Sequence, residues 1–259
     1  FNSRLMMTGI LYLVPNTLGD EVREDQLPHV LPTETIAQAA RLKYWIVENA
    51  KTARALLKAV GTIHPLICPI QEMQMSEWRG KDKKGDRQID LKDLLAPLQA
   101  GHDMGLMSEA GLPAIADPGA DVVRLAHQLR VPVIPLVGPS SLLLALMSSG
   151  LNGQSFAFHG YLPVNATDKA QTLKQLEQES RRKHQTQIWI ETPYRNAAMV
   201  EGMMESLAPS TLACVAVDLT LSTQWIRTAS IAQWREMSRQ DSQLLTRLHQ
   251  RPAVFLLLA

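Results

Sequence analysis

The first 149 residues alternate between short apolar runs and segments with helical periodicity, and this alternation restricts the possible folds most strongly. Five apolar runs have the length of a buried strand, namely residues 9–14, 44–47, 65–70, 104–107 and 131–137. The segments expected to be helical are residues 33–42, 51–60, 90–99 and 121–129, and the apolar segment 142–149. Strands and helices in strict alternation predict a mostly parallel sheet with flanking helices. We expect residues 9–14 to form a central strand and Gly61 to end the second helix.

The second half of the chain has a different pattern, with more strands and shorter helices. Strands are expected at residues 155–159, 187–190, 213–217, 225–228 and 253–258, and helices at residues 172–184 and 197–207. The sequence therefore predicts an α/β protein of two domains. Residues 1–137 form an α/β domain with a mostly parallel sheet, and residues 138–259 an α+β domain with a mixed sheet. Gly138-Pro139 is a plausible hinge between them.

Composition narrows the class of protein. A chain of 259 residues that is 46% apolar can bury two domain cores, and its net charge of +1 requires neither a nucleic acid nor a membrane partner. Cys68 and Cys214 both sit in apolar runs, which suits buried thiols in a reducing compartment. No apolar run reaches the length of a membrane span, residues 1–8 lack the features of a signal peptide, and no histidines or cysteines have metal-ligand spacing. We therefore expect a cytoplasmic protein without a metal site.

Two polar stretches could suggest a polyanion partner. Residues 72–88 are rich in charge and glycine, and a solvated loop explains them better than contact with a polyanion. Residues 181–183, Arg-Arg-Lys, lie near the end of a predicted helix, where cations interact favourably with the helix dipole. Neither stretch needs a ligand to explain it.

Residues 104–119 carry the strongest local sign of a ligand site. An apolar strand is followed by small residues, one carboxylate (Glu109) and two prolines. In open α/β sheets such a loop forms one wall of a ligand crevice, although an ordinary strand-to-helix connection explains it equally well. The glycine fingerprint of dinucleotide sites, the phosphate-binding lysine loop and the nucleophile-elbow serine are all missing from the sequence. The residues alone thus predict a small polar ligand at strand-end loops, but no reaction.

A resemblance extends this interpretation. Segments 108–119 (Ser-Glu-Ala-Gly-Leu-Pro…Ala-Asp-Pro-Gly) and 138–141 (Gly-Pro-Ser-Ser) resemble the tetrapyrrole-methylase superfamily of S-adenosylmethionine-dependent methyltransferases. Within it the chain is most similar to the branch that 2′-O-methylates a cytidine ribose in small-subunit ribosomal RNA. Four further segments match that branch in the same order: residues 11–20, 156–163, 189–195 and 215–220. The six segments are distributed in order over nearly the whole chain.

The chain departs from the family pattern at several positions. Residues 48–53, Glu-Asn-Ala-Lys-Thr-Ala, keep the glutamate of the family's Glu-Asp-Thr-Arg-x-Thr and lose its next carboxylate. Glu109 replaces an aspartate, and Asp218-Leu-Thr-Leu221 lacks the lysine of Glu-Leu-Thr-Lys. These changes fall largely where the substrate is expected, so the resemblance supports the cofactor more than the RNA.

The resemblance implies that S-adenosylmethionine binds in a cleft between the two domains. The residues implied to bind it are Pro15, Leu18, Glu109, Ala110, Leu112, Ser140, Ser141, Ile190, Val217, Pro252 and Ala253. Glu109 can also be read as a solvent-exposed loop carboxylate, and the two serines as helix caps.

Candidates for the catalytic groups are Glu48 and Glu191 as bases, and Arg195 as an anchor for a phosphate or carboxylate. A structural ion pair between Glu191 and Arg195 is at least as plausible as catalysis. The leading function is methylation of a ribose in ribosomal RNA, with the small ribosomal subunit as partner and a homodimer expected from the resemblance. The alternatives are methylation of a tetrapyrrole or another small molecule, and a non-catalytic cofactor-binding module.

Overall fold

A computed structural model describes residues 8–19, 26–80 and 90–259 of the chain. The chain divides into two compact units, Phe1–Ser140 and Ser141–Ala259. Part of the segment interpreted as a solvated loop, residues 81–88, lies outside the described residues, as do Asp20 of the segment 11–20 and residues 1–7.

The first unit contains a five-stranded, all-parallel sheet, as the alternation predicts. Its strands are β1 (Leu11–Leu13), β2 (Tyr44–Val47), β3 (Gln74–Glu77), β4 (Met104–Met107) and β5 (Val133–Pro135). Their order is β3-β2-β4-β1-β5. The predicted first strand is an interior strand, since β1 pairs with β4 on one side and β5 on the other, while β4 occupies the middle position.

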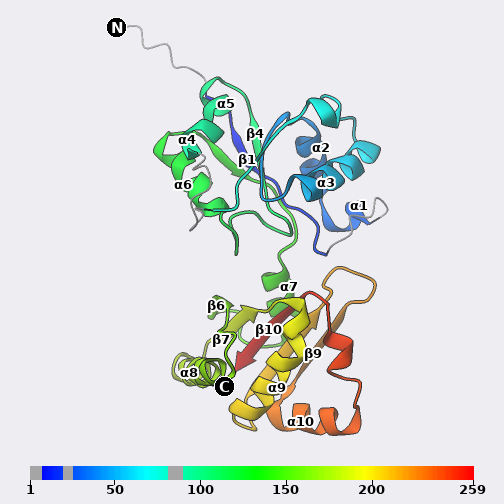
Figure 1. Cartoon of the computed structure of the whole chain (residues 1–259), viewed down its shortest axis with the longest axis vertical. Coiled ribbons are helices and arrows are strands. Elements are labelled where there is room, and N and C mark those ends of the chain that lie inside the picture. Colours follow the sequence, from blue (N-terminus) through cyan, green and yellow to red (C-terminus); the bar gives the residue numbers. More distant parts are fainter. Residues whose placement is uncertain (1–7, 20–25, 81–89) are drawn as a thin grey trace. The chain divides into compact units, whose positions relative to one another are not determined.

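Helices cover both faces of this sheet (Figure 1). They are α1 (Leu27–Val30), α2 (Thr33–Ala40), α3 (Ala50–Ile63), α4 (Leu91–Leu94), α5 (Ala96–Gln99) and α6 (Gly119–Gln128). Apolar residues of α1, α2 and α3 form one core with Trp45 and Val47, and those of α4, α5 and α6 form another with Leu11, Ile46 and Leu106. Successive residues of β2 thus point into different cores, as the two-residue repeat of a strand requires.

The predicted strand at residues 65–70 is wrong. The edge strand beside β2 is β3, inside the segment interpreted as a polar loop, and residues 70–72 form a short 3₁₀ helix (Ile70–Glu72). Pro65 and Pro69 lack the N–H groups that a sheet ladder needs. Because β3 is an edge strand with mostly exposed side chains, it has no apolar signature in the sequence.

Gly61 does not end α3, which continues to Ile63 before Pro65. A Cβ at Gly61 would lie 3.2 Å from the Leu66 side chain, so the glycine allows a close approach to the following segment. A proline cannot continue a helix, and the residue before it is disfavoured in the helical conformation, so Pro65 is the better stop signal here.

The second unit contains the predicted mixed sheet. Its strands are β6 (Phe156–Tyr161), β7 (Thr186–Ile190), β8 (Leu212–Val217), β9 (Trp225–Ser230) and β10 (Ala253–Leu258). Their order is β6-β7-β10-β8-β9; β6 and β7 are parallel, and the other pairs are antiparallel.

Four α-helices accompany this sheet in the described part of the unit. They are α7 (Ser141–Ser149), α8 (Ala166–Lys183), α9 (Asn196–Ser206) and α10 (Ile231–Gln240), with the short 3₁₀ turns η2 (Pro193–Arg195) and η3 (Thr246–Leu248). Leucines of α8, methionines of α9 and Trp234 of α10 share a core with Val215 and Phe255. The expectation of shorter helices is wrong for α8, which spans 18 residues. Helix α10 was not predicted, although its capping box, Ser230 with Gln233, is a recognisable helix start in the sequence.

The close contact between β2 and β4 gives a stability prediction. Trp45 is fully buried beside Gly105, and a Cβ at Gly105 would lie 2.3 Å from the indole Cζ3. We expect Gly105→Ala to lower the free energy of unfolding by about 1–3 kcal/mol through overpacking, as measured by urea denaturation. Adding Trp45→Phe should relieve part of that loss in a double-mutant cycle. Strictly additive effects would contradict the contact.

Candidate functional site

The loops after β1 and β4 meet at the carboxyl edge of the parallel sheet. The backbone N–H of Asn16 donates to the Gly111 carbonyl (2.9 Å), and the N–H of Gly111 donates to the Thr17 carbonyl (3.3 Å). The buried Asn16 side chain donates to the carbonyls of Ser108 (3.2 Å) and Glu109 (3.0 Å). Four hydrogen bonds between sequence-distant loops thus fix this edge as one structure.

The loop after β5 joins the same edge through two glycines. Gly111 has a φ of +67°, and a Cβ there would lie 3.1 Å from the Leu18 side chain and 3.2 Å from the Pro139 carbonyl. A Cβ at Gly138 would lie 2.3 Å from Pro15. Only glycine allows these loops to approach so closely.

The six cofactor residues predicted in this unit differ in their access to a ligand. Glu109 and Ala110 are exposed, Leu112 and Ser140 are half-buried, and Pro15 and Leu18 are buried. Glu109 and Ala110 can therefore touch a ligand directly. Buried Leu18 packs against Gly111 and shapes the loop, so its side chain has less access than the prediction implies.

Glu48 lies at this edge, directly after β2. Its Oε2 accepts the backbone N–H of Glu109 (3.0 Å), and the neighbouring Asn49 amide donates to Glu109 Oε1 (2.7 Å). Burial raises the pKa of Glu48, and the negative charges of Asp117 and Glu109 raise it further, although the Glu109 N–H and Arg79 oppose the shift. A carboxyl group with a raised pKa at a strand-end site is suited to accepting a proton.

Asp117 is a neighbour of Glu48 that the sequence analysis did not single out. Its Oδ1 accepts the N–H groups of Ala114 (3.0 Å) and Gly119 (2.6 Å), while its buried Oδ2 has no partner among the described residues. Burial raises the pKa of Asp117. Glu48 and Asp117 line a common cavity of about 10 Å³, the volume of a single water molecule and too small for a nucleoside. Asp117 therefore fixes the loop after β4 and influences Glu48 by its charge.

In the second unit, three predicted residues lie side by side across the sheet. Ala253 on β10 pairs with Val217 on β8, and the next residue, Val254, pairs with Ile190 on β7. Val217 and Ala253 are buried, Ile190 is half-buried and Pro252 is exposed. The fifth predicted residue, Ser141, begins α7 and is half-buried.

The expected ion pair between Glu191 and Arg195 is confirmed. An Arg195 Nη atom lies 2.8 Å from Glu191 Oε1, with the Arg195 side chain 22% exposed and the Glu191 side chain fully buried. The hydrogen bond that Arg195 donates to Glu191 raises the pKa of Arg195 above its usual value. A buried, paired carboxylate is poorly placed to reach a substrate, so the geometry favours Glu48 as the base.

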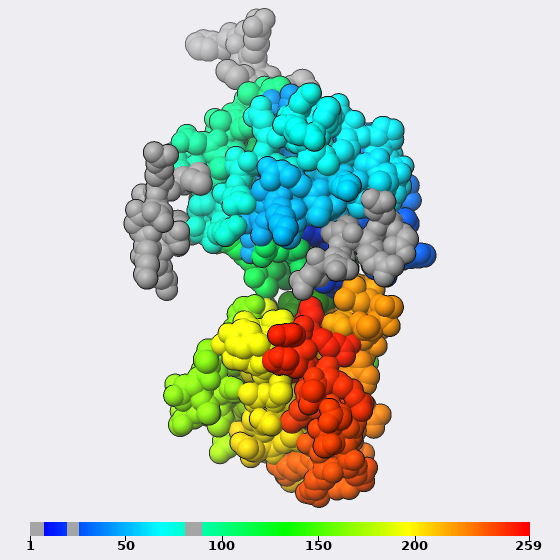
Figure 2. Space-filling model, turned by 45° about the vertical axis from the view of Figure 1, so that its right-hand side comes forward, coloured from blue at the N-terminus to red at the C-terminus, as the bar shows by residue number. Residues whose placement is uncertain are grey.

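A second buried ion pair, between Asp218 and Arg251, was not predicted. Arg251 Nε donates to Asp218 Oδ2 (2.8 Å), and its other nitrogens donate to the carbonyls of Arg247 (3.1 Å) and Thr223. Arg251 thereby joins the β8–β9 connection to the segment before β10. This segment lies at the surface beside α9 (Figure 2).

A cavity of about 360 Å³ lies against this ion pair, which is within the range of small-ligand pockets. Its lining residues are Ser222, Thr223, Gln224, Trp225, Leu244, Arg247, Leu248 and Arg251. It adjoins the predicted residues in sequence, because Asp218 follows Val217 and Arg251 precedes Pro252.

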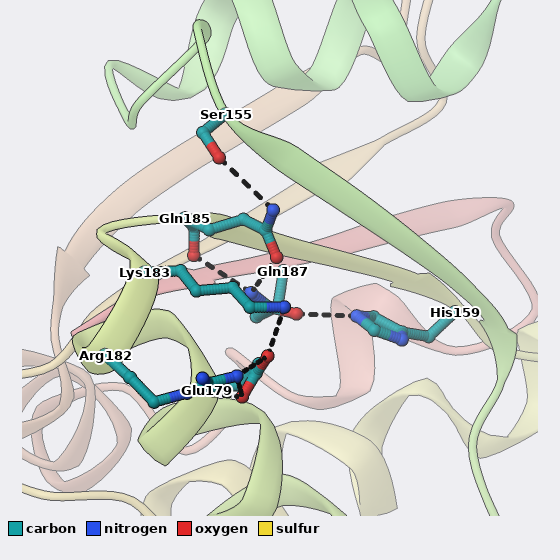
Figure 3. Close-up of polar contacts among 7 residues, drawn as sticks. All are labelled: Ser155, His159, Glu179, Arg182, Lys183, Gln185 and Gln187. Atoms are coloured by element: carbon teal, nitrogen blue, oxygen red, sulfur yellow. Dashed lines mark hydrogen bonds and ion pairs between the residues drawn. The ribbon is translucent and has the colours of Figure 1, made fainter.

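Two residues of the basic run at the end of α8 also make local contacts, in addition to the expected interaction of the run with the helix dipole. Arg182 donates to Glu179 (2.6 Å), and Lys183 also pairs with Glu179 (Figure 3). These hydrogen bonds lower the pKa of Glu179 to about 2. Beside them His159 and Gln187 are hydrogen-bonded (2.6 Å).

The described residues contain neither a metal-binding cluster nor a membrane-spanning helix. No group of three His, Cys, Asp or Glu side chains there is arranged to hold a metal ion. No helix in the same residues combines the length and hydropathy needed to cross a membrane.

Comparison with curated proteins identifies the family. No family model matches the chain. "Ribosomal RNA small subunit methyltransferase I" of Synechocystis sp. is 32% identical over 213 residues, covering 82% of this chain and 67% of that protein. The chain belongs to this methyltransferase family. The family member of Xylella fastidiosa is 28% identical over 234 residues, covering 90% of this chain and 77% of that protein.

The match to other family members is partial. The protein of Pseudomonas aeruginosa is 32% identical over 148 residues, which is 57% of this chain and 51% of that protein. The chain thus spans from about half to two thirds of the length of the first curated relatives that it matches.

Comparison with solved structures shows the fold of this chain. A putative cobalamin synthesis related protein (CobF) from Corynebacterium diphtheriae has a TM-score of 0.57 at 13% identity, covering 97% of this chain and 98% of that protein. Uroporphyrin III C-methyl transferase from Thermus thermophilus has a TM-score of 0.52 at 16% identity, covering 96% and 97%. The predicted two-domain tetrapyrrole-methylase fold is confirmed.

Proposed function

We propose that the chain is an S-adenosylmethionine-dependent methyltransferase that methylates a ribose 2′-hydroxyl in small-subunit ribosomal RNA. Its membership of the ribosomal RNA small subunit methyltransferase I family carries this proposal and favours RNA over a tetrapyrrole. The likeness to tetrapyrrole-related proteins concerns the fold alone. Cytoplasmic location and a homodimer stay predictions.

The strand-end edges suit the cofactor. Exposed Glu109 and Ala110 follow the middle strand of the parallel sheet, and the glycine contacts keep their loop close to the loop after β1. A carboxylate attracts the cationic groups of the cofactor. Small residues let the loop backbone come close enough to hydrogen-bond the polar groups of the cofactor. Ile190 and Pro252 would offer apolar contact from the second unit. That both sets hold one cofactor molecule stays a prediction from the resemblance.

When bound, the cofactor supplies an electrophilic methyl group on a sulfonium. The protein must hold the ribose hydroxyl near this group, and such positioning can lower the barrier by about 7–11 kcal/mol. We assign Glu48 to accept the hydroxyl proton, because its Oε2 is oriented by the Glu109 N–H and its pKa is raised. Glu191 and Arg195 are assigned a structural role through their ion pair.

Two measurements test this function. Calorimetry should show S-adenosylmethionine binding, and tritiated methyl groups should enter ribosomal RNA in small subunits purified from cells that lack the native modification. Alkaline hydrolysis should then leave the labelled nucleotide resistant, because 2′-O-methylation blocks cleavage. Label in a base, or in small molecules from RNA-free extract, would contradict the proposal, and binding without any transfer would support the non-catalytic alternative.

A further inference from the structure

Two tyrosines of the second unit expose most of their side chains near the end of β7. Tyr161, at the end of β6, is 59% exposed and pairs with Ile190 in the sheet register. Tyr194, in η2, is 61% exposed. The Arg195 guanidinium lies 5.1 Å from the centre of the Tyr194 ring, and its Nη1 donates to the Tyr194 hydroxyl (3.2 Å). Two exposed aromatic rings and one planar cation therefore lie close to the end of β7.

The backbone beneath Tyr194 is firmly held. Pro193 fixes one φ angle of η2, and its carbonyl accepts the Gln250 N–H (3.1 Å). Asn196 is fully buried and donates to the carbonyls of Leu248 (2.9 Å) and Arg251 (2.6 Å). Arg195 is fixed by its ion pair with buried Glu191. A large apolar ring exposed on a rigid base is preorganised for contact with another molecule.

The chemistry of this surface suits an unpaired base. Many unrelated proteins bind single-stranded RNA by stacking its bases on aromatic rings and on the planar guanidinium groups of arginines. Because Glu191 neutralises Arg195, the surface offers flat π faces rather than an excess of charge. We propose that Tyr161, Tyr194 and Arg195 form a stacking platform for unpaired bases of the RNA substrate. The platform rests on the proposed function, since stacking a base next to the target ribose would fix the nucleotide for methyl transfer.

The test measures RNA binding rather than catalysis. Fluorescence anisotropy with a labelled, unpaired RNA oligonucleotide should show that Tyr161→Ala and Tyr194→Ala each weaken binding about 5- to 150-fold. Tyr194→Phe should retain binding because it keeps the ring. Phe156→Ala is the matched control, since Phe156 is an exposed aromatic residue at the other end of β6 and should leave binding unchanged. The same RNA in a duplex should bind weakly to all variants.

Several results separate the platform from the proposed function. If the wild type and both alanine variants bind RNA with equal affinity, the platform is overturned. It is also overturned if the tyrosine variants change only the oligomeric state, because the surface would then contact protein. Calorimetry with S-adenosylmethionine on the same proteins should give unchanged affinity. If the wild type transfers no methyl group but RNA binding follows the tyrosine pattern, the proposed function fails and the platform stands.

Discussion

Replacing Glu48 with glutamine is expected to lower the rate of methyl transfer to RNA by about 10²–10⁴-fold, the usual contribution of a general base. Glutamine can still accept the Glu109 N–H, so the loop geometry should survive while the proton acceptor is lost. Single-turnover transfer of tritiated methyl groups measures the effect, and calorimetry should show that S-adenosylmethionine still binds.

The pH dependence of activity and of stability provides a second test of Glu48→Gln. A general base acts in its ionised form. Because the pKa of Glu48 is raised, activity should increase with pH at a higher pH than the usual glutamate pKa of about 4.3. This rise should disappear in Glu48→Gln. Folding favours the protonated form of Glu48, so its contribution to stability is present at low pH and lost as pH rises through the folded-state pKa. The glutamine variant should therefore gain stability relative to the wild type as pH rises through that window.

Glu77→Gln is the matched control. Glu77 is an exposed carboxylate at the end of β3, on the same sheet edge, and it accepts the Ala50 N–H (2.9 Å). Its replacement should leave the transfer rate within a few-fold of the wild type. If Glu48→Gln is equally active, the ribose proton leaves to water and Glu48 has no role as a base.

The sequence predicts elements well where burial imposes a local pattern. β2 and β10 were predicted at their observed boundaries, because both are apolar runs buried between polar or proline-containing flanks. β3 was missed because an edge strand with exposed side chains has no need of apolar residues. Periodicity reports which faces are buried, and it fails for elements that bury little.

The site was only partly predictable for a different reason. The strand-end position of Glu48 and Glu109 could be read from the sequence, because parallel strands end at one edge. Their hydrogen bond joins positions 61 residues apart, and the Asp218–Arg251 bond joins positions 33 residues apart. No local pattern encodes such pairs. The assignment of residues to a cofactor came from resemblance, which explains why buried Leu18 and exposed Glu109 were placed in one set.

Replacing Arg251 with methionine is expected to lower the free energy of unfolding by about 3–5 kcal/mol, since it leaves a buried carboxylate without its partner. The Asp218 side chain is 9% exposed and the Arg251 side chain 26% exposed, and Arg251 also holds the carbonyls of Arg247 and Thr223. Urea denaturation measures the loss. The 360 Å³ cavity that Arg251 lines should change shape as well.

Arg247→Met is the control that distinguishes the loss of a buried ion pair from the loss of an arginine that lines the cavity. Arg247 lines the same cavity, but its ion pair with Asp241 is exposed, with the arginine side chain 63% exposed, so its loss should cost at most about 1 kcal/mol. Asp218→Asn removes the charge and tolerates the positive φ of +49° at this position. Combined with Arg251→Met it should recover part of the lost stability, because the stranded charge is gone. If Arg251→Met costs no more than Arg247→Met, the connection between β8 and β9 is held by packing, and the cavity does not depend on the ion pair.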